Sequence, residues 1–179
     1  MELCQKYGKK IIKHVKTTQF QKKIKEEPEK QPEKFSMKLQ ANKKCETTTF
    51  SVHSLGPEYA NLINNNWKFK NKASFHWIQN QCKNGLAFGT FSSNDNDKDI
   101  KEPISWIIAY NYGSLGLLKT KEEWRGQGCA KICINALTQH LMSLGVTPFC
   151  FIEDFNQVSM CLFEKLGFEK THEVAWLVF

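Results

Sequence analysis

The feature that most constrains the fold of this chain is a glycine-rich segment, residues 125–130. It separates a predicted strand at 114–120 from a predicted helix that begins near residue 128 or 129. This helix is the clearest in the sequence because apolar residues recur on one face: Cys129, Ile132, Cys133, Ala136, Leu137, Leu141 and Leu144. Gly145 predicts its end. A strand, a glycine turn and a helix in this order place the amides of a first helical turn, which have no partner inside the helix, at the end of a sheet.

The glycines of this segment favour a bound anion. Gly126 and Gly128 lack a Cβ, so the backbone can turn tightly and a ligand can approach closely. A diphosphate at such a helix N-terminus meets several N–H donors at the positive end of the helix dipole. The helix dipole contributes only about 0.3–1 kcal/mol to the binding free energy. Tight binding therefore requires several charge-assisted hydrogen bonds as well. An ordinary strand-to-helix glycine turn is the alternative that the glycines alone leave open.

Other phosphate-binding loops fit this segment worse. A Walker loop ends in Gly-Lys-Ser/Thr, which the sequence lacks, and Lys131 stands where a dinucleotide-binding fingerprint has its third glycine. Arg125 supports an anion site, because 24 of the 25 basic residues are lysines and the single arginine stands at the entrance to the loop. Its guanidinium matches anionic oxygens in a way that lysine cannot.

The remaining predicted elements define an α+β fold. Strands are expected at 47–52, 86–91, 104–110, 114–120, 149–152 and 174–179, and helices at 57–63, 74–82, 129–144 and 156–166. Strands grouped ahead of a strand–helix–strand unit describe a mixed sheet with helices on both faces, an α/β/α sandwich. The chain of 179 residues is long enough for one such domain.

The positive charge lies in the N-terminal segment. Residues 1–44 hold 13 lysines and 5 glutamates, and the remainder is close to neutral, so the net charge of +7 comes from this segment. We therefore predict a lysine-rich tail and linker at 1–46, disordered or partly helical, followed by a folded domain at 47–179. A basic amphipathic helix acting as a mitochondrial presequence is the alternative. The neutral domain argues against a nucleic-acid partner.

Membrane, metal and disulfide chemistry are not expected. No apolar run is long enough to span a bilayer, and no N-terminal apolar stretch predicts a secretory signal. Seven cysteines without regular spacing indicate reduced thiols in an intracellular compartment, mitochondrial or cytoplasmic. Cys129 and Cys133 are expected to be buried as small hydrophobes rather than to hold a metal.

Two motifs of the chain resemble a known family. The run Arg125-x-x-Gly128-x-Ala130 matches the Q/R-x-x-G-x-G/A signature of the GNAT superfamily of CoA-dependent N-acetyltransferases, and the run Asn156-x-x-Ser159 that leads to Phe168 resembles its second signature. Within the superfamily, 47–179 is similar to the C-terminal acyltransferase domain of glycine N-acyltransferase-like proteins. The motifs that carry this likeness are Asn64-Asn65-Asn66-Trp67, Ser74-x-x-Trp77-Ile78, Ser105-Trp106 and Glu122-Glu123-Trp124-Arg125.

The resemblance implies a mostly antiparallel sheet and a site for acyl-CoA or acetyl-CoA. The sheet would splay between the strands that end at Thr120 and Ile152 and so admit the thioester. The strand before the loop would pair with the pantetheine arm, the loop would bind the pyrophosphate, and Asn156 would contact the arm or act only as a helix N-cap. The implied cofactor-binding residues are Leu118, Lys119, Thr120, Arg125, Gly126, Gln127, Gly128, Cys129, Ala130, Asn156 and Ser159.

The acid–base groups depart from the family pattern. The glycine-conjugating relatives have a glutamate near the start of the strand before the loop, where this chain has Ser114. Many GNAT enzymes have a tyrosine as the acid for the leaving thiolate, where this chain has Phe163. Glu153, just past the strand that ends at Ile152, is the replacement base that we predict, acting directly or through water. A solvated loop carboxylate is the alternative.

The sequence thus predicts an acyl-CoA-dependent N-acyltransferase whose acceptor is a small-molecule amine, with an amino acid such as glycine among the candidates. Two alternatives stay open: a CoA-binding protein without catalytic activity, and an acetyltransferase that acts on a protein or polyamine amine. The acyl chain, the acceptor and the oligomeric state have no signal in the sequence.

Overall fold

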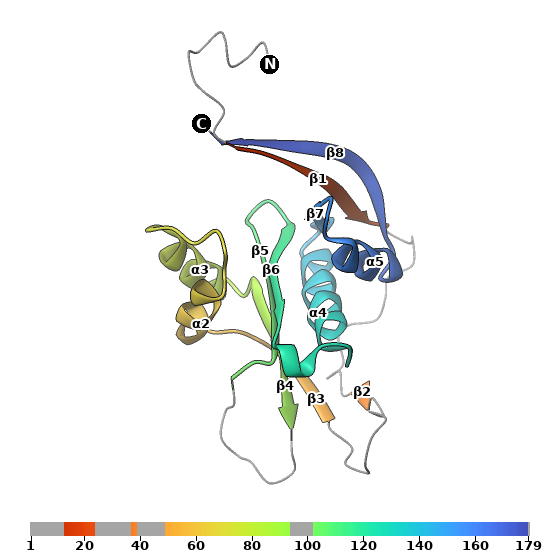
Figure 1. Ribbon diagram of the computed structural model, residues 1–179. Helices are drawn as coiled ribbons and strands as arrows, with labels where there is room; N and C mark the ends of the chain where they lie inside the picture. Colours follow the sequence, from red (N-terminus) through yellow and green to blue (C-terminus); the bar gives the residue numbers. More distant parts are fainter. Residues whose placement is uncertain (1–12, 24–36, 39–48, 94–101, 179) are drawn as a thin grey trace. The chain divides into compact units, whose positions relative to one another are not determined.

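The computed structural model describes residues 13–23, 37–38, 49–93 and 102–178. The chain divides into two compact units (Figure 1), one from Met1–Ile24 and Phe149–Phe179 and the other from Lys25–Pro148. Strands and helices occur in both units, which confirms the predicted α+β class.

The strands of the larger unit form an antiparallel meander. β3 (Thr49–Ser54), β4 (Ala87–Ser93), β5 (Ser105–Ala109) and β6 (Ser114–Thr120) pair in sequence order, and β2 (Met37–Lys38) pairs with β3. The β5–β6 connection is a tight turn in which Gly113 takes a φ of 87°. Glycine reaches this left-handed conformation without strain.

Helices cover both faces of this sheet (Figure 1). The 3-10 turn η1 (Pro57–Tyr59), α2 (Ala60–Asn65) and α3 (Ser74–Lys83) lie on one face, and α4 (Cys129–Ser143) lies on the other. β5 supplies side chains to both. Trp106 and Ile108 are buried in the cluster that α2 and α3 form, and the fully buried Ile107 between them points the opposite way. Helices on both faces, as predicted, are therefore confirmed for this unit.

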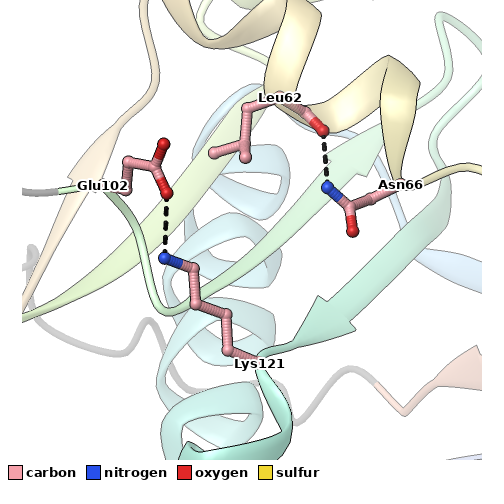
Figure 2. Close-up of polar contacts among 4 residues, drawn as sticks. All are labelled: Leu62, Asn66, Glu102 and Lys121. Carbon is pink, nitrogen blue, oxygen red and sulfur yellow. Dashed lines mark hydrogen bonds and ion pairs between the residues drawn. The ribbon is translucent and has the colours of Figure 1, made fainter.

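Polar side chains fix the connection between α2 and α3. The Asn66 side-chain amide donates to the carbonyl of Leu62 at 2.9 Å and closes the last turn of α2 (Figure 2). The Ser74 hydroxyl donates to Asn64 Oδ1 at 2.6 Å, and the Ser74 amide donates to Asn71 Oδ1 at 3.1 Å. The loop between the two helices is therefore tied to both of them.

The smaller unit is built around a strand from the N-terminal segment. β1 (Lys13–Lys22) pairs antiparallel with β7 (Phe149–Glu153) on one side and with β8 (Phe168–Val178) on the other. α5 (Gln157–Lys165) packs against β8. The buried apolar residues of this unit are Phe20, Cys150, Ile152, Met160, Phe163, Leu166 and Phe168.

β1 corrects the prediction for residues 13–22. This stretch was expected to be disordered or partly helical, but it is a strand in which Thr17 and Phe20 are buried. A register shift between Gln19 and Phe20 breaks the alternation that would have revealed the strand, and both of its pairing partners lie far away in the sequence. The helical interpretation rested on the spacing of Cys4, Tyr7, Ile11, Ile12 and Val15; the first four lie outside the described residues, and Val15 lies in β1.

The other predicted elements are confirmed with small shifts. The helix expected at Pro57 begins as a 3-10 turn, and the last strand begins at Phe168 rather than at residue 174. Its first half was missed because the side chains of residues 169–173 are polar and exposed. Among the described residues, no helix combines the length and the apolar character needed to cross a bilayer.

Candidate functional site

β6 carries a bulge at the centre of the predicted arm-binding strand. Its pairing with β5 shifts register between Trp106 and Ile108. Leu117 has a φ of 52°, and no other non-glycine residue in the described part of the chain has a positive φ. The extra residue of such a bulge interrupts the ladder and bends the strand. Leu118, Lys119 and Thr120, predicted to pair with the pantetheine arm, follow this bulge directly.

Two left-handed glycines lead from β6 into α4. The 3-10 turn η2 (Glu122–Trp124) follows β6, Gly126 has a φ of 76°, and Gly128, the N-cap of α4, has a φ of 84°. A side chain is strained at such angles, so the conformation explains why both positions are glycine. The strand, loop and helix predicted from the sequence are confirmed in this order.

The backbone amides at the start of α4 are available to a ligand. No side chain caps α4. Within the described residues, no hydrogen bond is donated by the amides of Gly126, Gln127, Gly128, Cys129 or Ala130 to a backbone acceptor outside the helix. The Ile132 amide is the one that closes the first turn, to the carbonyl of Gly128 at 3.2 Å. This is the arrangement in which a helix N-terminus binds an anion.

Buried polar contacts anchor the first turn of α4 to the sheet. The Thr90 hydroxyl of β4 donates to the carbonyl of Cys129 at 3.1 Å and lies 2.9 Å from the Sγ of Cys133. The Cys133 thiol donates to the carbonyl of Ser105 at 3.4 Å. Burial raises the pKa of the Cys133 thiol to about 11, so it is neutral at pH 7. Cys129 and Cys133 are thus buried as predicted, and Thr90 is a supporting residue that the sequence did not reveal.

The charged side chains near the loop form exposed ion pairs. Arg125 Nη2 lies 3.5 Å from Glu122 Oε1, and the Arg125 side chain is 58% exposed. Lys121 Nζ lies 3.0 Å from Oε2 of Glu102, which precedes β5 in the chain (Figure 2). Glu123 is exposed, and its carbonyl accepts from the side chain of Gln127 at 3.2 Å. Glu122 and Glu123 are therefore surface residues, and the Arg125 guanidinium is exposed to solvent, where an anion can reach it.

The other predicted site residues lie together in the smaller unit. Asn156 is the N-cap of α5, and its Oδ1 accepts from the amide of Ser159 at 3.2 Å, so its capping role is confirmed. Glu153, at the end of β7, is half-buried, and its carbonyl accepts from the amide of Asn156 at 2.7 Å. The roles of these three residues toward a cofactor or an acceptor stay predictions, as does the splay of the sheet.

The positions where the family pattern has acid–base groups are buried in this chain. Ser114 is 2% exposed at the start of β6, and Phe163 is buried against Phe168, with ring centroids 5.0 Å apart. Neither residue can supply a proton-transfer group of the kind the family pattern has. Burial, together with the charge that Tyr112 would carry, raises the pKa of the Tyr110 phenol to about 12. Tyr110 is therefore a neutral hydrogen-bond donor at pH 7.

Among the described residues, no group of three or more His, Cys, Asp or Glu side chains is placed to hold a metal ion. A family model described as FR47-like protein matches residues 96–177, which include the loop. The matched range includes both β6 and α4, as well as the segment from Asn156 to Phe168. No curated protein sequence matches the chain.

Solved structures show what the fold is similar to. A Drosophila protein has a TM-score of 0.70 and 18% identity, with 98% of this chain and 54% of that chain covered. A GNAT-family acetyltransferase from Colwellia psychrerythraea has a TM-score of 0.58 and 18% identity, with 99% of this chain and 60% of that chain covered. This chain thus spans little more than half of the length of these two.

A third structure has a ligand named with it. It is AAC(6′)-Iy in complex with the bisubstrate analogue CoA-S-monomethyl-acetylneamine, with a TM-score of 0.54 and 16% identity over 73% of this chain and 95% of that chain. Identities this low show the fold alone. The chain therefore has the mixed α+β fold of the GNAT acetyltransferases, as the sequence predicted.

Proposed function

We propose that this protein is an acyl-CoA-dependent N-acyltransferase that transfers an acyl group to a small amine, and that the acceptor is an amino acid. One observation carries the cofactor part of the proposal. The first-turn amides of α4 have no backbone or side-chain acceptor in the described residues, and they follow two left-handed glycines and the exposed Arg125 in the chain. A diphosphate would supply the missing acceptors, and the GNAT fold and the FR47-like match support this assignment.

The reaction that we propose is a direct attack on the thioester. The amine nitrogen forms a bond to the acyl carbon, the carbon–sulfur bond breaks, and CoA leaves as a thiol after its sulfur takes up a proton. Leu118, Lys119 and Thr120 would hold the pantetheine arm past the bulge, and Arg125 with the loop amides would hold the pyrophosphate. Uniform binding of this kind lowers the KM for acyl-CoA and leaves the acceptor to be activated separately.

Activation of the acceptor is the chemical demand that the site must meet. An amine with a pKa of about 10.4 is only ~0.04% neutral at pH 7, a deficit of roughly 4.6 kcal/mol. We assign the role of base to Glu153, acting directly or through water. The Glu153→Gln variant keeps the size of the side chain and removes its basicity, so loss of kcat with an unchanged KM for acyl-CoA would support this role.

A second candidate function rests on a specific observation. Ser114 and Phe163 are both buried and neither can accept a proton as a carboxylate or donate one as a phenol. The alternative is therefore a protein that binds acyl-CoA without turning it over. An acetyltransferase that acts on a protein or polyamine amine is a further alternative, which differs only in the acceptor.

Two measurements separate these functions. Acetyl-CoA and longer acyl-CoAs should raise the melting temperature of the full chain, and Arg125→Ala and Gly128→Val should reduce this shift. No shift at millimolar acyl-CoA would exclude the cofactor. A thiol-release assay over several acyl-CoAs and amines then tests the reaction. Binding of acyl-CoA without release of CoA thiol in the presence of any of these amines would favour a protein that binds acyl-CoA without turning it over.

A further inference from the structure

Three hydroxyl side chains form a row across the sheet of the larger unit, on the face that α4 covers (Figure 1). Thr90 of β4 is the register partner of Ser105 of β5, and Ser105 is the register partner of Thr120, the last residue of β6. Cross-strand partners in an antiparallel sheet point to the same face. We call these three residues the hydroxyl row. Thr90 and Ser105 are fully buried, and Thr120 is half-buried.

The Thr90 end of the hydroxyl row holds the first two turns of α4. The Thr90 hydroxyl donates to the Cys129 carbonyl at 3.1 Å and lies 2.9 Å from the Cys133 thiol. The Cys133 thiol also donates to the main-chain carbonyl of Ser105 at 3.4 Å. The helix turn whose amides we assign to the pyrophosphate is therefore bonded to the middle of the row.

The Ser105 side chain holds the strand that we assign to the pantetheine arm. Its hydroxyl lies 3.0 Å from the carbonyl oxygen of Lys119 and 2.8 Å from Oγ1 of Thr120. A serine hydroxyl has one proton, and a carbonyl oxygen can only accept. Ser105 therefore donates to Lys119, and Thr120 donates to Ser105. Both protons are used inside the sheet, where they fix the last two residues of β6.

The bulge in β6 explains why this end of the strand needs a contact of its own. The pairing of β5 with β6 changes register at the bulge, so the end of β6 does not inherit its position from the start of the strand. Beyond the bulge at Leu117, the Ser105 hydroxyl binds the strand from its side chain, and the Lys121 amide donates to the Ile104 carbonyl at 2.9 Å. These bonds tie the arm-binding residues to β5.

We propose that Ser105 is a positioning residue for acyl-CoA, which holds the arm-binding strand in place relative to the turn of α4 that binds the pyrophosphate. The inference rests on the proposed function, since it concerns the cofactor site of that reaction. Ser105 is 0% exposed, so it acts through β6 and not by touching the ligand. The pyrophosphate and the arm belong to one molecule, and a site whose two halves are already in place loses less free energy to ordering when that molecule binds.

Two ligands distinguish the tasks of Thr90 and Ser105. ADP has the diphosphate without the pantetheine arm, whereas acetyl-CoA has both. Ser105→Ala should raise the Kd for acetyl-CoA roughly two- to tenfold and leave the Kd for ADP at its wild-type value, because the bond from Cys133 goes to the main chain and survives. Thr90→Val should raise both Kd values by similar factors.

Calorimetric titration with acetyl-CoA and ligand-observed NMR with ADP, both on the full chain, measure these values. An equal rise for the two ligands in Ser105→Ala, or a rise for neither, would overturn the proposal. Absence of ADP binding to the wild type would also overturn it, because the turn of α4 would then hold no diphosphate.

Ser74→Ala is the matched control for the loss of a buried serine hydroxyl. Ser74 is 4% exposed, and its hydroxyl donates to Asn64 Oδ1 in the connection between α2 and α3. Both alanine variants should lower the Tm, but only Ser105→Ala should weaken acetyl-CoA. Equal Kd values for acetyl-CoA in the two variants would show that the Ser105 hydroxyl stabilises the fold and does nothing more.

A double variant separates the position of the strand from the stability of the fold. Ser105→Ala leaves the Thr120 hydroxyl without its acceptor, and adding Thr120→Val removes that hydroxyl as well. The double variant should recover part of the lost Tm. Its Kd for acetyl-CoA should stay as high as in Ser105→Ala, because the Lys119 carbonyl still lacks the Ser105 donor. Recovery of wild-type affinity for acetyl-CoA would contradict the positioning role.

Failure of this inference can be told apart from failure of the proposed function. A wild-type chain that does not bind acetyl-CoA would refute both. Binding of acetyl-CoA that Ser105→Ala leaves unchanged would overturn the positioning role alone. With an amine that supports thiol release, Ser105→Ala should raise the KM for acetyl-CoA and leave the KM for the amine unchanged.

Discussion

The hydroxyl of Thr90 and the carbonyl of Cys129 form a buried hydrogen bond of 3.1 Å that joins the middle of β4 to the first residue of α4. The same hydroxyl lies 2.9 Å from the Cys133 thiol, so one side chain holds the first two turns of the helix. The amides that we assign to pyrophosphate binding belong to the first of these turns. Their position is therefore set from inside the sheet, by a residue that no ligand would contact.

Thr90→Val removes this anchor while it keeps the β-branched shape of the side chain. We expect the free energy of unfolding to fall by about 0.5–1.5 kcal/mol for each hydrogen bond lost, and the affinity for acyl-CoA to fall with it. Thr138→Val is the matched control. Its hydroxyl is also buried but has no hydrogen-bond partner in the described residues, so this change should be neutral or stabilising. Urea unfolding and acyl-CoA titration of both variants provide the comparison. Equal losses of stability would show that the Thr90 hydrogen bonds do not anchor the first turn of α4.

Gly126 and Gly145 provide a second matched pair. Both are exposed, both have φ near 75°, and a Cβ at either position would meet nothing within 4 Å. Alanine should therefore cost each of them a similar strain of about 1–2 kcal/mol. Only Gly126→Ala should also weaken acyl-CoA binding, by about tenfold if one charge-assisted hydrogen bond is lost, because Gly145 follows the other end of α4. Equal affinities of the two variants for acyl-CoA would show that the loop does not bind the cofactor.

The parts of the site that could be predicted from the sequence depend on neighbouring residues. The loop was identified because its arginine and its glycines immediately precede a helix with a clear apolar period in the sequence. The Asn156 cap was identified because it immediately precedes its helix. Thr90 could not be identified, because its partner lies 39 residues away and a threonine in a strand is ordinary. The rest of the hydroxyl row was missed for the same reason, since only the pairing of β5 with β6 brings Ser105 to Thr120.

The N-terminal strand is where prediction from the sequence was wrong, and this gives a third test. Phe20 is fully buried in β1, whereas its neighbour Gln21 is exposed. Phe20→Ala should lower the free energy of unfolding by about 3–5 kcal/mol, and Gln21→Ala should change it by less than about 0.5 kcal/mol. Thermal and urea unfolding of the full chain are the measurements. A disordered or separately helical tail would make both variants indistinguishable from the wild type.

Buried thiols give the fold a dependence on alkaline pH. Burial raises the pKa of Cys82 and of Cys133 to about 11, from an ordinary value of 9.0. Below about pH 8 both thiols are protonated in the folded and unfolded states, so their contribution to stability is complete and constant. Between pH 9 and 11 the unfolded chain releases protons that the folded chain retains. The free energy of unfolding should therefore fall as pH rises, by up to about 1.4 kcal/mol per pH unit for each thiol. Urea unfolding from pH 7 to 10.5 measures this slope, and Cys82→Ala should make it shallower because one titrating group is gone. An unchanged slope in that variant would show that the Cys82 thiol ionises as readily in the folded state as in the unfolded one.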